Sequence, residues 1–226
     1  MSRSFTLTDS LALGDLQVFL GRAMHVEDGS VRLIAGASVL AVYVSVLHPA
    51  GLLDESPTVL GLRTFAISPG ESFDAVVPVR SLAMRVEGKI EAAALSPEEP
   101  VSISLPMEVN TVTWAAISPP RGGWLALETT VSATLEAAAR SGIDEIAEAI
   151  PTGTGEQIVQ RVRTEIWGRS IDGLDFVPAG AAFAAFSLGF LEDDEIVSIF
   201  ETGPWTRLTT RGGHVLVKRR AWSITR

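Results

Sequence analysis

Apolar positions in the first half of the chain alternate between helical and strand spacing. Helical spacing over 14–25 and over 80–95 predicts two helices. Alternating or continuous apolar segments between and after these helices predict strands. The predicted strands are 31–35, 39–47, 60–67, 73–78, 101–105 and 109–117. The first half is therefore predicted to be a sheet with two helices.

Helical spacing dominates the second half until its last thirty residues. The predicted helices span 130–140, 143–150, 156–169 and 178–190. The predicted strands span 196–201, 205–210 and 215–219, and Arg211-Gly212-Gly213 predicts a hairpin turn between the last two. The whole pattern predicts an α+β fold, with a sheet-rich N-terminal part and a helical C-terminal part closed by a β-hairpin.

The change of pattern coincides with a segment that disfavours regular structure. Residues 118–123 contain two prolines and two glycines, which continue neither helix nor strand. We therefore predict two domains, 1–118 and 119–226. Both halves also contain a helix, an acidic turn and a hairpin in that order. This similarity fits either a duplication or two independent uses of a common arrangement.

Known catalytic motifs are missing from the sequence. The chain has no cysteine, which excludes disulfides, thiolate metal sites and cysteine nucleophiles. Neither lysine stands in a phosphate-binding loop, and Gly153-Thr-Gly155 lacks the third glycine of the dinucleotide fingerprint. The three histidines have no partner at metal-ligand spacing. We therefore predict no metal and no cofactor.

Catalysis stays open at this stage. The sequence has no Gly-x-Ser-x-Gly elbow, but catalytic residues need not be neighbours in sequence. An enzyme whose site is assembled only in the fold is therefore one alternative for the function.

The net charge of −9 bears on nucleic-acid binding. An acidic protein repels the phosphate backbone, so the charge argues against nucleic acid as a partner. The C-terminal 25 residues, however, contain six basic residues and no acidic one. Helices at 143–150 and 156–169 followed by this basic hairpin resemble a winged helix-turn-helix. A DNA-binding regulator that uses the hairpin is thus a second alternative.

No segment predicts export or membrane insertion. The start lacks a continuous apolar core and a cleavage site. The longest uncharged apolar run, 33–47, is short for a membrane span and predicts buried strands. We expect a cytoplasmic protein with no membrane partner.

Three stretches of the second half combine aromatic, arginine and small residues. They are 119–124, 178–191 and 203–217. Together they resemble an uncharacterised family of proteins from high-GC actinobacteria. The resemblance covers mainly 119–217 and implies an actinobacterial, cytosolic origin, but no activity.

Arginine and tryptophan on loops favour the recognition of anions or partners. The candidate ligand or partner patch consists of Arg121, Trp124, Trp205, Arg207 and His214. With no catalytic motif present, we predict a non-catalytic cytosolic binding or protein-interaction protein. Its expected partners are further copies of itself and an unidentified protein or small anionic ligand.

Overall fold

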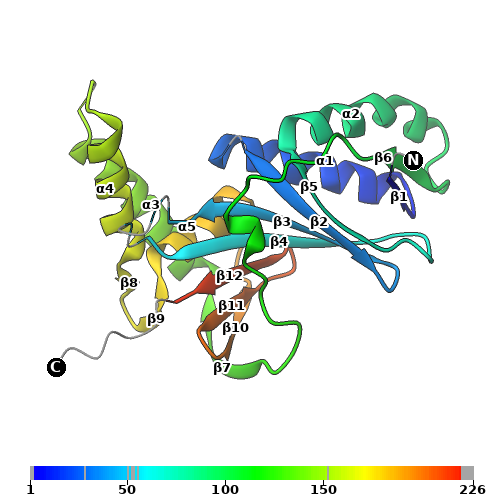
Figure 1. Cartoon of the computed structure of the whole chain (residues 1–226). Helices are drawn as coiled ribbons and strands as arrows, with labels where there is room; N and C mark the ends of the chain where they lie inside the picture. Colours follow the sequence, from blue (N-terminus) through cyan, green and yellow to red (C-terminus); the bar gives the residue numbers. More distant parts are fainter. Residues whose placement is uncertain are drawn as a thin grey trace. The chain divides into compact units, whose positions relative to one another are not determined.

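The protein has an α+β fold, as predicted, and its residues fall into two compact units (Figure 1). The computed structural model describes residues 3–27, 29–49, 51, 54, 56–151 and 153–219. Unit 1 contains residues 1–45 and 62–117, and unit 2 contains residues 46–61 and 118–226.

Unit 1 is built around four strands in the order β5-β2-β3-β4. A second, two-stranded sheet joins β1 to β6, and helices α1 and α2 pack against each other (Figure 1). The elements are β1 (Ser4–Leu7), α1 (Ser10–Val26), β2 (Ser30–Gly36), β3 (Val39–Leu47), β4 (Thr58–Ala66), β5 (Phe73–Pro78), α2 (Val79–Leu95), β6 (Val101–Ser104) and the short 3-10 helix η1 (Trp114–Ala116). The end of β3 and the start of β4 belong to unit 2.

Unit 2 contains the strands β12-β11-β10-β7 in that order and the two-stranded sheet β8-β9. Helix α3 packs against α4 and α5, and α5 also packs against β12. The elements are β7 (Leu125–Val131), α3 (Ser132–Ala149), α4 (Glu156–Gly168), β8 (Ser170–Ile171), β9 (Leu174–Pro178), α5 (Ala179–Ser187), β10 (Ile196–Thr202), β11 (Trp205–Thr209) and β12 (His214–Lys218).

The two units share one topology. In each, a strand and a helix (β1-α1, β9-α5) lead into three consecutive strands (β2-β3-β4, β10-β11-β12). An edge strand, β5 or β7, pairs with the first of those three and runs into a helix, α2 or α3. The short strand after that helix pairs with the leading strand, as β6 does with β1 and β8 with β9. In unit 1 the segment β1-α1-β2-β3-β4 comes before β5-α2-β6. In unit 2 the order is reversed, because β7-α3-β8 comes before β9-α5-β10-β11-β12. Helix α4 has no counterpart in unit 1. The similarity noted in the sequence is part of this shared topology.

Local chemistry explains where several elements begin and turn. Helix α1 begins earlier than predicted because the side chain of Asp9 caps it, with Oδ1 accepting a hydrogen bond from the N–H of Ala12 at 2.8 Å. The turn between β2 and β3 lies at Ala37 and Ser38, whose φ angles are 49° and 61°. Two consecutive residues with positive φ angles form the tight turn of a two-residue hairpin, and Gly36 ends β2 just before them.

Several predictions of elements are wrong. The strand expected at 109–117 is a loop with η1, in which Trp114 is buried. Strands β1, β7, β8 and β9 stand where no strand was expected. The two helices expected at 130–140 and 143–150 are one helix, because α3 continues through Gly142 to Ala149.

Candidate functional site

Arg207 lies at the centre of one face of the sheet in unit 2. Directly opposite residues on antiparallel strands share a face, and Arg207 lies opposite Phe200 on β10 and Leu216 on β12. We call this the Arg207 face, which has nine positions on three strands. They are Ser198, Phe200 and Thr202 on β10, Trp205, Arg207 and Thr209 on β11, and His214, Leu216 and Lys218 on β12.

The guanidinium group of Arg207 contacts two aromatic rings. Its Cζ lies 4.5 Å from the ring centroid of Trp124 and 4.5 Å from that of Phe200. An aromatic ring attracts the positive charge but accepts no conventional hydrogen bond, so the N–H groups of the guanidinium still need acceptors. Among the described residues none accepts a hydrogen bond from Arg207, and its Nε is buried. Trp124 and Phe200 therefore hold the guanidinium of Arg207 in place, but no described carboxylate pairs with it.

The loop before β7 positions Trp124. The indole Nε1 donates a hydrogen bond to the backbone oxygen of Pro120 at 3.2 Å. Gly123 adopts a φ of 76°, which strains other residues, and a Cβ atom there would meet Thr202 Oγ1 at 3.5 Å. The proline and the glycines of this segment thus direct the indole onto Arg207.

His214 shares the Arg207 face and is half-buried. Its Nδ1 lies 3.1 Å from Thr209 Oγ1, directly across from it on β11. Burial lowers the pKa of the His214 imidazole, and the positive charge of Arg207 lowers it further. Burial also lowers the pKa of Arg207, although a guanidinium remains charged at any physiological pH.

Four of the five residues in the predicted patch lie on or against the Arg207 face. Trp124 contacts Arg207 directly, whereas Trp205 lies two residues before it and is buried. Arg121 is exposed and makes no contact with them in the described part of the chain. Sequence reasoning missed Phe200, because only the register of β10 against β11 places it opposite Arg207. The role predicted for this patch stays a prediction.

The other polar groups form no recognisable catalytic set. His25 Nδ1 lies 2.7 Å from the backbone oxygen of Gly21, one turn earlier on its own helix. Buried Glu195 ties backbone segments together, since its Oε1 accepts a hydrogen bond from the N–H of Arg211 at 2.6 Å. Within the described residues no three His, Asp or Glu side chains are grouped to hold a metal ion.

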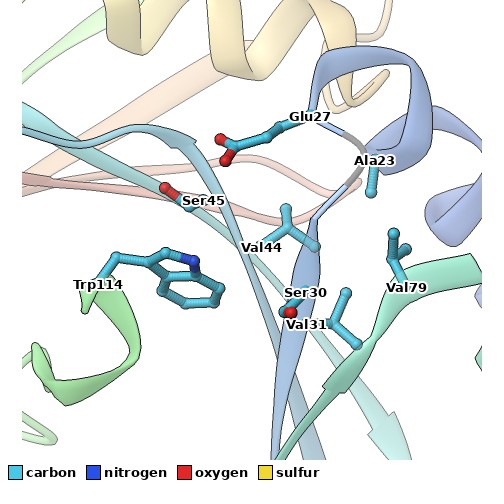
Figure 2. Close-up of a pocket in the computed structure, with 8 residues that line it drawn as sticks. All are labelled: Ala23, Glu27, Ser30, Val31, Val44, Ser45, Val79 and Trp114. Atoms are coloured by element: carbon cyan, nitrogen blue, oxygen red, sulfur yellow. The ribbon is translucent and has the colours of Figure 1, made fainter. Parts of the chain in front are cut away.

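Unit 1 contains a small cavity between α1, β2, β3 and Trp114 (Figure 2). Glu27, Ser30 and Ser45 contribute polar atoms to a lining that is otherwise mostly apolar. The cavity measures about 10 Å³, which corresponds to about one water molecule on this measure. It is too small for a substrate.

Two further observations concern α3 and the helices as a group. Because α3 is one helix of 18 residues, the short first helix of the expected helix-turn-helix does not exist.

No helix in the described ranges has the length and apolar character that crossing a membrane requires.

Two parts of the chain match models of domains of unknown function. Residues 1–107 match the model of one such domain (DUF8010), and residues 119–222 match the model of another (DUF8185). No curated protein matches the chain in sequence.

Solved structures show that the fold is similar to that of bacterial sliding clamps. The DNA polymerase sliding clamp from Caulobacter crescentus has a TM-score of 0.50 and 13% identity over 99% of this chain and 67% of the clamp chain. The sliding clamp from Bacillus subtilis has a TM-score of 0.51 and 11% identity over 100% and 67% of the two chains. DNA polymerase III subunit beta from Borrelia burgdorferi has a TM-score of 0.53 and 7% identity over 99% and 66%. The chain therefore spans about two thirds of the length of these clamp chains.

This similarity corrects two predictions. The predicted function, a non-catalytic binding or protein-interaction protein with a regulator or an enzyme as alternatives, is contradicted by a fold shared with DNA polymerase clamps. The prediction against nucleic acid as a partner conflicts with the same finding. It rested on the net charge, which governs adhesion to phosphates but does not prevent a protein from enclosing DNA.

Proposed function

We propose that the protein is a sliding-clamp-like protein that assembles with further copies of itself and encloses DNA. The observation that carries this proposal is the similarity in fold, which extends over 98–100% of the chain in the clamps compared. The known clamps are named for DNA polymerase, so the process is DNA replication or a closely related task on DNA.

The shared topology of the two units supports this proposal. Closed assemblies are built from similar modules related by rotation, and this chain already contains two such modules. A compact module of about 100 residues has a radius of gyration of about 13 Å. It is therefore too small to surround a duplex alone, and enclosure requires several copies.

The charge of the protein fits enclosure better than adhesion. A protein that binds by phosphate contacts needs many cations at its interface, and its affinity for DNA falls steeply as the salt concentration rises. A net charge of −9 rules out strong adhesion of the whole surface, whereas a ring stays on DNA by topology. Helix α2 is the most basic helix of unit 1, with Arg80, Arg85 and Lys89 exposed against two glutamates. We assign the surface of α1 and α2 to the side that faces DNA.

Strand β7 is the candidate contact between copies. It pairs with β10 on one side only, and the described residues offer it no second partner strand. Leu125, Val131 and Ile196 at this edge are 67%, 47% and 66% exposed. An exposed edge with apolar side chains adds another strand readily. At the other edge strand, β5, Val109 already donates a hydrogen bond to the backbone oxygen of Val76 at 2.8 Å.

A threading assay tests the proposal. The full chain is incubated with linear duplex DNA attached to beads at one end, and the free end is then blocked with a bulky protein. A threaded ring should survive a wash in about 0.5 M salt, which removes adhesive binding. It should leave when a restriction enzyme cuts the DNA.

Two results would refute the proposal. One is loss of all protein in the salt wash, and the other is retention that persists after the cut. The mass of the assembly, measured by light scattering, should exceed that of one chain of 24.0 kDa.

We further propose that the protein works in the cytoplasm, because a clamp-like role on DNA would be carried out there. The preference for arginine over lysine, with only Lys89 and Lys218 present, supports a high-GC organism such as an actinobacterium.

A further inference from the structure

Arg207 combines contacts to two aromatic rings with the lack of a hydrogen-bond acceptor among the described residues. Arg140 provides the internal comparison, since its guanidinium lies 4.8 Å from the ring centroid of Phe186. The guanidinium of Arg140 is also paired with a carboxylate, because Oε1 of Glu136 accepts hydrogen bonds from Nε of Arg140 at 2.9 Å and from its Nη2 at 2.7 Å. Arg207 has aromatic contacts of the same kind, and no described carboxylate takes the place of Glu136.

A guanidinium in this state is ready to bind an anion. Its planar N–H groups match two oxygens of a carboxylate or a phosphate. The two ring contacts fix the group in one orientation, so that binding an anion costs little further ordering.

The charges of the Arg207 face favour an anion as well. Its nine positions include Arg207, Lys218 and His214 but no acidic residue. This contrasts with the acidic protein as a whole. Glu201 of β10 points to the opposite side of the sheet, where its Oε2 lies 3.2 Å from Nη2 of Arg219. The nearest acidic residue of the strand is thus already paired.

We propose that the Arg207 face is a binding site for one oxyanion, a carboxylate or a phosphate, held by the free N–H groups of Arg207. Trp124 and Phe200 hold the guanidinium in place, and Lys218 adds positive charge. Two cations are too few for a stretch of duplex DNA, so the site takes a single charged group. The inference does not depend on enclosure of DNA, and its failure would leave the proposed function untouched.

The test is a titration of the full chain with inorganic phosphate and, separately, with acetate, at constant ionic strength set with chloride. The imidazole NMR signals of His214 report on the site, as does the part of the tryptophan fluorescence that is lost in a Trp124→Phe variant. We expect a saturable change with at least one of the two anions. The bound anion offsets the charge of Arg207 and should therefore raise the pKa of His214.

Variants separate this site from general charge effects. Arg207→Gln should abolish the saturable change, and Arg207→Lys should weaken it at least several-fold, because lysine keeps the charge but loses the planar pair of donors. The matched control is Arg140→Gln, which removes an arginine that is also stacked but is already paired, and which should leave the titration unchanged. Trp124→Ala, followed through His214, should weaken binding while Arg207 remains.

The outcomes are distinct. Saturation by phosphate alone supports a site for a phosphate group, and saturation by acetate as well supports a site that also accepts a carboxylate. No saturable change with either anion, or an equal change in a folded Arg207→Gln variant, would overturn the proposal. Circular dichroism establishes that each variant is folded.

Discussion

Gly142 of α3 lies against the indole ring of Trp167 of α4. A Cβ atom at residue 142 would stand 2.7 Å from Cη2 of Trp167, and closer still to Cζ3. The indole has no room to withdraw, because Trp167 is buried and stacks on Phe183 with the ring centroids 4.5 Å apart. This contact sets the distance between α3 and α4.

Gly142→Ala should therefore destabilise the protein. Replacing a glycine inside a helix by alanine stabilises it by about 1 kcal/mol, but overpacking a core costs about 1–3 kcal/mol. Since the clash involves a rigid ring, we expect a net loss of about 1–2 kcal/mol in urea denaturation. Gly88→Ala in α2 is the matched control, because nothing lies within 4 Å of its added Cβ, and it should be neutral or stabilising. Equal effects of the two substitutions would contradict this account.

Gly142 also shows where sequence reasoning fails. The sequence predicts separate helices at 130–140 and 143–150, because glycine disfavours helices and often follows their last turn. Contact with Trp167 outweighs that preference, and this contact joins residues 25 positions apart. Strand β7 was missed for a related reason, since most of its residues are exposed and their pattern shows no buried face.

Patterns that depend on neighbouring residues were predicted well. Strand β2 and the first part of β3 bury alternate residues, so that their sequence spacing reveals them. The terminal hairpin is revealed by apolar segments on both sides of Gly212-Gly213. In the candidate site, too, contacts between residues distant in sequence could not be predicted. Arg207, Trp124 and His214 attracted notice by residue type, whereas the contact of Arg207 with Phe200 depends on register.

The stability of unit 2 should depend on His214 in a defined pH range. The pKa of His214 in the folded state is lower than the ordinary histidine value of 6.5. The unfolded chain therefore binds a proton more readily, and stability falls as the pH drops below about 6.5. The loss stops once the pH is below the lowered pKa of the folded state. Denaturation at a series of pH values should show this slope in the wild type and a smaller slope in His214→Gln. An identical pH dependence of the two proteins would contradict the assignment.

The contact between Trp124 and Arg207 should contribute measurably to stability. A cation over an indole contributes about 0.5–2 kcal/mol, depending on burial. A double-mutant cycle with Trp124→Ala and Arg207→Met should therefore give a coupling energy of about 1 kcal/mol. The control cycle combines Trp124→Ala with Arg140→Met, which share no contact, and its coupling should be near zero. A zero coupling in the first cycle would mean that the two side chains do not interact in solution.

Self-association through the β7 edge predicts which charges disrupt the assembly. Val131 lies directly opposite Ile196 across β7 and β10, and both side chains are largely exposed. A lysine at either position places a charge where another copy would pack apolar atoms, and burying an unpaired charge is costly. Val131→Lys and Ile196→Lys should therefore reduce the light-scattering mass toward that of a single chain. They should also abolish salt-resistant retention on blocked DNA.

Met107→Lys is the control for this prediction, because Met107 is also an exposed apolar residue but lies in a loop far from β7 in sequence. It should leave both the mass and the retention unchanged. If the β7 variants keep the mass of the wild type, the copies meet elsewhere. If they lose the mass but keep salt-resistant retention, enclosure by an assembly is wrong.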